Sequence, residues 1–591
     1  MSTSKLHTQV LILLLVFLPV VLSAQETTVD RNVTVEREFQ PVVQDAGKIS
    51  SLPEILNINI SKERVAYSDF LQTLPIGKNF LNLPAVEVIH KRRPIGRDAI
   101  IRLGMGNYWN TFGEIALPLI ISDKSRLDLR LDHLGTFGTR KHSMTGAGLD
   151  FNRYFPRYDL YAGVKLSHEY FNYYGKNFSK DNTEIDLNDL RTANQGIDPM
   201  YTEQSLELIT RPVQSIKLSD LAAAAIDDVL WRFNAHAGIR SLPNPIGLTY
   251  TGELNFDLFK SENGLQENMI RTLFGYQTTH GSNRLGMDFE LTNLFYSKNN
   301  LPALNFWEYY SVFSMNPYYL IDNTDLYLKA GVKASFSFIH GRPFNPMPDI
   351  FAEWKVLPHV LSVYGGITGE FSISTLSSIA EENPYVFTDL RVKDAYTPVN
   401  LFVGFKVKTQ HNLLIDAFMD YRFIDDQYFF VNKGYRTTQI SGAGEYLYTN
   451  RFNAIYSDAS LFRVGVRGNY SIRNMVNVQV KGVYNGWNVE DESYAWMKPG
   501  FEADLSADWR ITRGLSASAN FFFEGTRYAK IGNDAIRMRP RVDLNLGASY
   551  AFNRTFSTFA RVNNLVNSKY EYFYGYRVQG INFLLGGAIS F

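Results

Sequence analysis

The sequence predicts an all-β protein: a membrane-spanning antiparallel β-barrel of about 22 strands with a short N-terminal segment. Three observations support this prediction: long stretches of strict alternation, tight turns between them, and an N-terminus typical of an exported protein. The last stretch shows the alternation most clearly. Its apolar parity is Ile581, Phe583, Leu585, Gly587, Ile589 and Phe591, and its small or polar parity is Asn582, Leu584, Gly586, Ala588 and Ser590. Because successive side chains of a strand point to opposite faces, this strand has one face suited to lipid.

The first 24 residues have the parts of a cleavable secretory signal. A basic start precedes an apolar run from Val10 to Leu22, and small residues follow at Ser23 and Ala24. The run is shorter than the roughly 20 apolar residues that a membrane-spanning helix needs. We therefore expect residues 1–24 to be a signal peptide that is cleaved after Ala24. No later stretch resembles a transmembrane helix, so a membrane-embedded product must be a barrel.

The rest of the chain divides into two parts by composition. Residues 25–96 are mixed and polar with several prolines, and we expect them to form a periplasmic segment or a segment that lies in the barrel lumen. Residues 97–591 are dominated by alternation and are expected to form the barrel. The expected location is the outer membrane of a Gram-negative bacterium.

Five further stretches support the barrel by alternating in the same way: residues 325–338, 462–470, 501–510, 515–524 and 541–550. A soluble β-sandwich also has alternating strands, but its strands are usually about 5–6 residues long. In addition, Trp509, Tyr550 and Phe552 lie beside tight turns, where an aromatic belt at a membrane interface would place them. Length and aromatic placement therefore favour the barrel.

Short connections give the strand count. Ten are found, at residues 122–125, 155–157, 242–245, 280–283, 322–323, 357–359, 410–412, 472–474, 512–514 and 553–554. Ten periplasmic turns with both chain ends in the periplasm imply about 22 strands. This count treats residues 424–458 as one outer loop with a hairpin of its own, and a hairpin that joined the wall would add two strands.

Long connections are expected at the opposite, outer end of the barrel. The longest are about residues 173–226, 375–397 and 424–458, and residues 221–225 are expected to be helical. Connections of this length are usually functional or disordered, so these loops are the predicted points of first contact with a ligand.

Composition excludes several classes of protein. The formal net charge is +0, whereas nucleic-acid binders usually carry a basic excess, so no nucleic-acid partner is expected. The chain has no cysteine, which excludes disulfides, thiolate metal sites and a lipid-modified N-terminal cysteine. It has 35 Tyr, 42 Phe and 7 Trp, enough for aromatic girdles at two membrane interfaces.

The C-terminal hairpin resembles the end of TonB-dependent receptors, a family of 22-stranded outer-membrane barrels. The matching residues are Asn564, Leu565, Asn567, Tyr570, Gly580 and the terminal Phe591, whereas the Arg that often follows the second glycine is replaced by Ile581. The resemblance covers about residues 97–591, and the style of the sequence resembles outer-membrane proteins of the Bacteroidetes. It implies that Phe591 is a signal for barrel assembly. The family also carries a folded plug before the barrel, for which residues 25–96 are too few.

Charged residues on the parity opposite to lipid are the sharpest candidate site. Those predicted to face the lumen are Asp128, Arg130, Asp132, Arg463, Arg467, Lys481, Glu502, Asp504, Asp508, Arg541 and Asp543. They could tune what passes through a pore. Because their signs are mixed and balanced, we favour the alternative that they form ion pairs that brace the wall or hold a filling segment.

No residues of the sequence predict catalysis. Ten histidines are scattered, and His133, His142 and His168 are expected near the outer ends of strands without metal-binding spacing. No local motif supplies a nucleophile with a base, so we expect no enzyme activity, no metal and no cofactor.

Two functions follow from these expectations. The resemblance implies a barrel that takes part in uptake or passage of a ligand across the outer membrane. The missing plug raises the alternative of a non-transporting subunit or scaffold in a complex for protein assembly, export or surface display. Expected partners are outer-membrane lipid and the barrel-assembly machinery, with a surface lipoprotein or a periplasmic protein as a further candidate.

Overall fold

The structure is a computed structural model. It describes residues 99–175, 184–186, 215–217, 227–242, 247–281, 283–296, 309–339, 341–387, 390, 392–409, 412–436, 446–472 and 475–591. The predicted signal peptide, the segment 25–96 and the helix predicted at residues 221–225 lie outside these residues and stay predictions.

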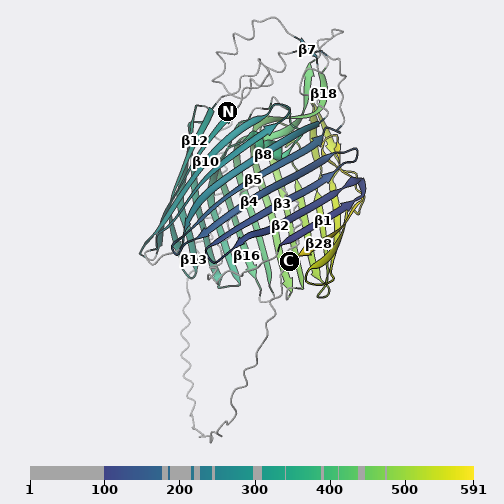
Figure 1. Cartoon of the computed structure of the whole chain (residues 1–591). Coiled ribbons are helices and arrows are strands. Elements are labelled where there is room, and N and C mark those ends of the chain that lie inside the picture. Colours follow the sequence, from purple (N-terminus) through teal and green to yellow (C-terminus); the bar gives the residue numbers. More distant parts are fainter. Residues whose placement is uncertain are drawn as a thin grey trace, which may run out of the picture. The chain divides into compact units, whose positions relative to one another are not determined.

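The described residues form one antiparallel sheet of 22 strands, together with three two-stranded sheets (Figure 1). The ring closes where β1 pairs with both β2 and β28, with Ile100 opposite Ser590 and Gly106 opposite Leu584. The predicted barrel and its strand number are therefore confirmed. The strands are β1 (Ile100–Gly106), β2 (Thr111–Ile121), β3 (Ser125–Thr136), β4 (His142–Tyr154), β5 (Tyr158–Asn172), β8 (Asp227–Ser241), β9 (Thr249–Ser261), β10 (Gln266–His280), β11 (Asn283–Tyr296), β12 (Tyr309–Asp322), β13 (Leu326–Phe338), β14 (Phe344–Leu357), β15 (Leu361–Ser372), β16 (Ala395–Lys408), β17 (Leu413–Arg436), β18 (Tyr446–Ile472), β19 (Val476–Val489), β20 (Phe501–Arg510), β21 (Leu515–Glu524), β24 (Arg541–Ala551), β25 (Phe556–Asn563) and β28 (Asn582–Ser590).

The two ends of the barrel differ. Each of the ten predicted turns joins two consecutive strands at one end, here called the short-turn end, where β28 also finishes. The connections at the other end, the long-loop end, contain the smaller elements: η2 (Asn107–Trp109), α4 (Leu376–Glu382), and the strand pairs β6 (Glu184–Asp186) with β7 (Ser215–Lys217), β22 (Arg527–Ile531) with β23 (Asp534–Met538), and β26 (Glu571–Phe573) with β27 (Tyr576–Arg577). None of the helices among the described residues is long and apolar enough to cross a membrane.

The prediction of a separate hairpin at residues 424–458 is wrong. The wall strands themselves continue through this region, so β17 has 24 residues and β18 has 27. Their pairing shifts register between Ile424 and Gln427, where Asp426 has a φ of +60°. This bulge breaks the alternation in the sequence, although it does not end the strand. The β17–β18 pair extends past the rim of the barrel in Figure 1.

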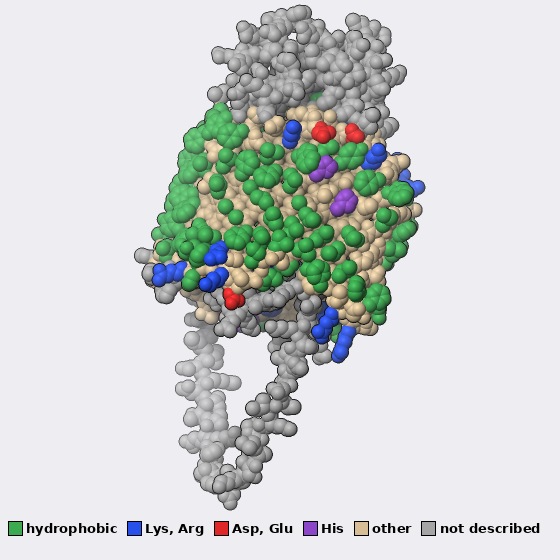
Figure 2. All heavy atoms as spheres, viewed as in Figure 1, with side chains coloured by type: hydrophobic (Ala, Val, Ile, Leu, Met, Phe, Trp, Pro, Cys, Tyr) green, Lys and Arg blue, Asp and Glu red, His purple; other side chains and the backbone are tan. Residues whose placement is uncertain are grey.

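The sheet has an apolar outer face and a polar inner face. Leu103, Val332 and Leu585 are among the many large apolar side chains exposed on the outer face, and Trp509, Tyr550 and Phe552 are exposed beside their turns as predicted. Figure 2 shows apolar side chains spread over the wall and Lys and Arg side chains along its lower rim. An apolar belt between polar rims is the surface that a lipid bilayer accommodates.

The resemblance at the C-terminal hairpin has a local structural basis. Asn564 and Asn567 have φ values of +50° and +53°, a conformation that Asn tolerates better than most residues. The Asn564 side chain donates to the carbonyls of Ser568 (3.0 Å) and Gln579 (2.8 Å), and it is buried. The Tyr570 hydroxyl donates to Asp543 (2.8 Å). At the end of the chain, the backbone groups of Phe591 and Ala99 bond to each other and complete the ring.

Candidate functional site: the roofed mouth and the inner wall

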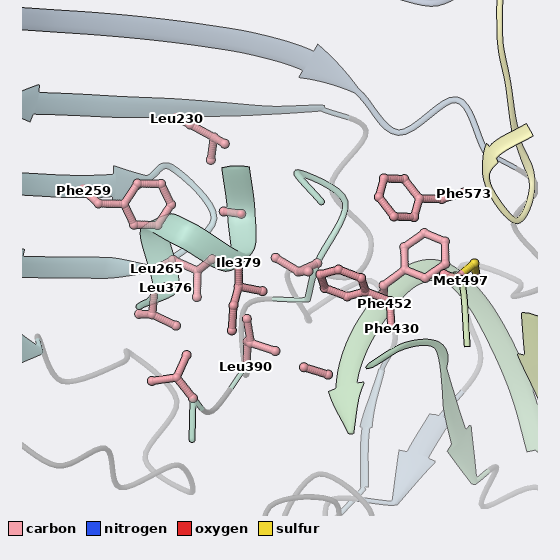
Figure 3. Packing of buried hydrophobic residues seen from close by; sticks show 14 of the residues in the cluster. Leu230, Phe259, Leu265, Leu376, Ile379, Leu390, Phe430, Phe452, Met497 and Phe573 are labelled. Atoms are coloured by element: carbon pink, nitrogen blue, oxygen red, sulfur yellow. The ribbon is translucent and has the colours of Figure 1, made fainter. Parts of the chain in front are cut away.

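Loops from many connections meet in one apolar cluster at the long-loop end (Figure 3). We call it the mouth cluster. Its buried members are Phe171, Tyr173, Leu230, Phe259, Leu265, Leu294, Tyr296, Tyr310, Val312, Leu376, Ile379, Ala380, Val386, Leu390, Val392, Phe430, Phe452, Ala454, Met497, Ala529, Met538, Phe573 and Tyr576. Those on strands β5, β8, β9, β11 and β12 belong to the inner face, and the others come from loops and strand extensions. The loops therefore fold inward and pack against the inner wall.

The connection between β15 and β16 contributes the centre of this cluster. We call its described residues, 373–387, 390 and 392–394, the roof segment. Helix α4 begins with a capping box, in which the Thr375 and Ser378 side chains each accept from the other's backbone N–H. Leu376, Ile379 and Ala380 then lie on one side of the helix and are buried in the cluster. The Leu376 N–H also donates to the Glu267 carboxylate on β10 (2.8 Å), which fixes the helix to the wall.

An ion pair anchors the other end of α4. The Glu382 carboxylate lies 2.6 Å from the Lys498 ammonium, and it also accepts from the Tyr428 hydroxyl. Burial alone would raise the pKa of Glu382, but Lys498 and Tyr428 outweigh it, so the pKa is below its ordinary value. The Lys498 ammonium also lies over the rings of Tyr428 and Phe430. This contact joins the loop after β19 to the roof segment and to β17.

A second acidic group, Asp394, joins the two ends of the roof segment. Asp394 accepts from the Tyr310 hydroxyl on β12 and from the Ser374 N–H (3.0 Å). Desolvation raises the pKa of Asp394 to about 7, and the neighbouring Asp426 adds to this rise. Next to it, the Lys393 ammonium pairs with Asp426 on β17. The two ends of the roof segment are thus held together by one carboxyl group.

Backbone and ring contacts join the roof segment to distant loops. The Phe387 N–H donates to Phe452 on β18 (2.8 Å), and the Phe452 N–H donates to Tyr385 (3.0 Å). Tyr385 stacks on Tyr576 with ring centroids 3.6 Å apart, and the Tyr576 hydroxyl donates to the Asn450 carbonyl (2.9 Å). These contacts connect the loops before β16 and β28 with the extension of β18. The roof is therefore one interlocked structure.

The inner wall below the cluster is lined by ion pairs. The predicted charged residues all share the face that carries the wall part of the cluster, opposite to the exposed apolar side chains. The structure brings Arg463 to Asp420 (2.9 Å), Arg467 to Asp416 (3.7 Å), Lys481 to Glu502 (3.8 Å) and Asp504 (3.6 Å), and Arg541 to Glu524 (2.7 Å).

The remaining predicted charges have separate neighbours. Asp128 pairs with Arg126 (2.6 Å), and Arg130 lies 4.0 Å from Glu114. Asp543 accepts from Tyr570 (2.8 Å), Asp132 lies opposite Gly146, and Asp508 lies on β20 opposite Asn477. The predicted set is therefore distributed around the wall in short-range pairs and is not gathered in one site. Its part in ligand passage stays a prediction.

Aromatic rings form a second layer of the inner wall, which the sequence did not indicate. Tyr364 lies across Gly404 of the next strand, and a Cβ at Gly404 would be 2.4 Å from its Cζ. The Lys406 ammonium covers this ring, 4.8 Å from its centroid, and pairs with Glu353 (3.0 Å). Two further sets of residues repeat this arrangement. Phe418 lies across Gly465 and is covered by Arg467, and Tyr318 lies across Gly286 and is covered by Lys329. Glycine lets the rings lie against the wall, so the large side chains do not fill the lumen.

Sequence reasoning missed the partners of these charges and the mouth cluster. Glu114, Asp416, Asp420 and Glu524 have the inward parity and could have been found by the same alternation. The mouth cluster offered a weaker signal, namely apolar residues within a long polar connection, such as Ile379 and Val386.

The histidines do not form a metal site among the described residues. His142 is on the inner face and lies 3.1 Å from the Glu169 carboxylate. His133 and His168 are on the outer face near the long-loop end, in register with the apolar parity of their strands. All three lie near the long-loop ends of their strands, and that this end faces outward stays a prediction.

The sequence matches no protein-family model and no curated protein. Solved structures with a similar fold include the pyoverdine outer membrane receptor FpvA of Pseudomonas aeruginosa PAO1, which is 11% identical with a TM-score of 0.57, over 85% of this chain and 80% of that one. The ferric-catecholate import receptor Fiu of E. coli K12 is 11% identical with a TM-score of 0.57, over 84% and 82%. The siderophore receptor PirA of Acinetobacter baumannii is 10% identical with a TM-score of 0.57, over 84% and 80%. At these identities the likeness is one of fold, and the chain has the 22-stranded barrel fold of TonB-dependent outer-membrane receptors.

Proposed function

We propose that the chain is an outer-membrane protein that takes part in the passage of a ligand across that membrane, with the mouth cluster as its gate. The observation that supports this proposal is the combination of loops packed together in the mouth of the barrel with a polar inner wall whose rings lie flat. An apolar outer belt supports the membrane location. The long-loop end would face the outside and the short-turn end the periplasm.

Ligand passage requires the roof segment to move. Three polar contacts hold it from the sides: Leu376 N–H with Glu267, Glu382 with Lys498, and Lys393 with Asp426. Each contact joins the segment to a different strand or loop, so a ligand that binds the loops and separates them would release the helix. A ligand can shift this equilibrium only by the difference between its affinities for the open and closed roof. No reaction is part of this function.

The chain contains no cysteine, which allows a clean test of the gate. Val386 and Phe452 face each other as bridge partners, so a Val386→Cys, Phe452→Cys double variant places two thiols at disulfide distance. In cells, we expect Ile379→Asp to loosen the roof and sensitise the strain to vancomycin, a hydrophilic antibiotic too large for ordinary porins. Adding the oxidised disulfide to Ile379→Asp should restore resistance.

Single-cysteine variants under the same oxidant are the controls. If Ile379→Asp is folded at the cell surface and the cells stay fully resistant, the barrel is not a passage and the proposal fails.

The ion pairs of the inner wall favour a second candidate, a non-transporting scaffold in an outer-membrane complex. Charges such as Arg541 and Arg463 are bound to wall carboxylates, which stabilises the barrel without any ligand. Purification of the tagged protein from its native membrane separates the two candidates. A fixed partner in equal amount together with a resistant Ile379→Asp strain would favour the scaffold.

A further inference from the structure

The pairing between β14 and β15 stops partway along both strands. β14 begins at Phe344, and β15 ends at Ser372. Their register, however, ends with Asp349 opposite Thr368, and the described residues beyond this pair form no further ladder pairs between the two strands. On its other side, β14 stays paired with β13 as far as Phe344. The interruption is therefore confined to the β14–β15 side, toward the long-loop end.

Two prolines of β14 explain this interruption. The Ser337 N–H of β13 donates to the carbonyl of Pro343, just before β14 (3.1 Å), so odd-numbered residues here direct their backbone groups toward β13. Because successive residues of a strand alternate, Pro346 and Pro348 direct theirs toward β15. Proline has no N–H, so β14 lacks a donor for β15 at both positions. Instead, the Pro346 carbonyl accepts from the Tyr396 hydroxyl of β16 (2.6 Å).

A second interruption lies beside the first. The register between β15 and β16 shifts next to Gly369, and the register between β16 and β17 shifts between Tyr396 and Asn400, an interval that contains Pro398. A Cβ at Gly369 would be 2.8 Å from the Pro398 carbonyl oxygen and 2.7 Å from the Met347 Cβ, so this close approach requires glycine. Gly369 and Pro398 are therefore adjacent breaks in two neighbouring strands.

Beyond these breaks, the ends of β15 and β16 form one unit with the roof segment. The two ends stay paired with each other, with Glu370 opposite Thr397 and Ser372 opposite Ala395. The roof segment connects them, and its apolar side chains lie in the mouth cluster (Figure 3). We call the described residues of this unit, 369–387, 390 and 392–398, the flap.

Side-chain contacts tie the flap to the wall on both sides. The bond from the Tyr396 hydroxyl to Pro346 is one tie to β14. The Arg342 guanidinium, which comes from the connection before β14, lies 4.7 Å from the centre of the Tyr396 ring and pairs with Asp425 on β17 (3.1 Å). These contacts can separate without any unpairing of the strands nearer the short-turn end.

We propose that the flap rotates as one body about Gly369 and Pro398, while the parts of β15 and β16 nearer the short-turn end stay in the wall. Hinges of this kind are a few residues that absorb the change in backbone torsion angles. The prolines of β14 lower the cost of the movement, because the ladder that would hold the flap on that side is already interrupted. The role of the movement in ligand passage rests on the proposed function, whereas the hinge can be tested without a ligand.

Hydrogen exchange of the full-length protein in detergent, measured by mass spectrometry of overlapping peptides, tests the hinge. Backbone amides exchange when their part of the structure opens. We expect residues 370–372 and 395–397 to exchange together. Their rate should exceed that of residues 361–368 and 400–408 in the same strands by about tenfold, the equivalent of one hydrogen bond. Residues 334–336 of β13, which are paired on both sides, control for fraying and should exchange slowly.

A proline variant tests the cause of the interruption. Pro346→Val with Pro348→Val supplies two N–H groups that face β15, so the ladder should extend and the exchange of residues 369–372 should slow by about tenfold. Pro317→Val is the matched control, because Pro317 is also exposed on the outer face but interrupts the register with β13, away from the flap. Heat-modifiability on gels shows whether each barrel is folded.

Tyr396→Phe tests the tie without altering the backbone. It removes the hydroxyl bond to Pro346 and keeps the ring beside Arg342, so exchange at both edges of the flap should rise by about fivefold, as expected for one lost hydrogen bond.

Three results would overturn the hinge: equal exchange rates along the whole of β15, unchanged exchange in the folded Pro346→Val, Pro348→Val barrel, or a rise in Tyr396→Phe that is confined to residues 395–397. If the hinge is confirmed but cells that carry Ile379→Asp stay resistant to vancomycin, the movement stands and ligand passage alone is overturned.

Discussion

The mouth cluster and the inner wall below it share several strands but are held together differently. On β5 and β8, Phe171 and Leu230 are buried in the cluster. Two residues further down the same strands, Glu169 and Arg232 form an ion pair (2.6 Å). Apolar burial joins the loops at one end of the barrel, whereas ion pairs and rings that lie against the strands stabilise the wall. The closure and the wall should therefore respond independently to mutation.

The largest expected effect comes from a charge within the mouth cluster. Ile379 is fully buried, and Ile379→Asp places an unpaired carboxylate there, at a cost of about 3 kcal/mol or more. We expect the roof to open while the barrel stays folded, because the wall pairs are untouched. Single-channel conductance and heat-modifiability on gels measure these two properties. Glu381→Ala, at an exposed position of the same helix, is the control, and equal conductance of the two variants would argue against the cluster as the seal.

A smaller effect is expected at the anchor of α4. Lys498→Met keeps the length of the side chain but leaves the Glu382 carboxylate without its cationic partner and with only the Tyr428 hydroxyl, which costs about 1–3 kcal/mol. Openings should become frequent but brief, because the apolar contacts of α4 remain. The double variant Glu382→Gln, Lys498→Met removes both charges and should open less often than Lys498→Met alone. If the double variant is more open than Lys498→Met alone, the ion pair is not the anchor.

A substitution in the wall is expected to lower the stability of the barrel without opening its mouth. Gly404→Val would displace the Tyr364 ring and its Lys406 cover, at a cost of about 1–3 kcal/mol. This variant should lower the unfolding temperature of the barrel without raising its conductance. Gly482→Val is a matched control, since a Cβ at Gly482 meets nothing within 4 Å. Loss of the closed mouth in Gly404→Val would show that roof and wall are coupled.

The smallest effect is a dependence of closure on pH. The pKa of Asp394 is raised to about 7 in the closed roof, so the proton is held more tightly there than when the roof is open. The resulting stabilisation is complete in acid and is lost as pH rises toward and through 7. Openings should therefore be more frequent at pH 8 than at pH 5.5. Glu382 stays ionised over this range, because its pKa is below the ordinary value of a glutamate. Asp394→Asn should show a smaller difference in closure between the two pH values, and a wild type without any pH response would contradict this assignment.

The sequence was sufficient to predict the wall because the signal is local. Alternation has a period of two residues, and each short turn lies between its own strands, so strand number and inward charges follow without knowledge of distant contacts. The hairpin at residues 424–458 was misinterpreted because the bulge at Asp426 shifts the parity within one strand.

The roof could not be predicted, because its signal in the sequence is not local. It depends on contacts between residues far apart in the chain, such as Tyr385 with Tyr576 and Glu382 with Lys498. Each loop alone shows only a few apolar residues in a polar stretch. Which loops meet depends on the closed ring, because the order of the strands around it decides which loop ends lie together.

Conductance of the purified Val386→Cys, Phe452→Cys barrel in a planar bilayer, compared before and after reduction in an Ile379→Asp background, tests the central claim most directly. The account predicts a silent oxidised barrel that conducts once the disulfide is reduced. An oxidised barrel that conducts as freely as the reduced one would contradict it.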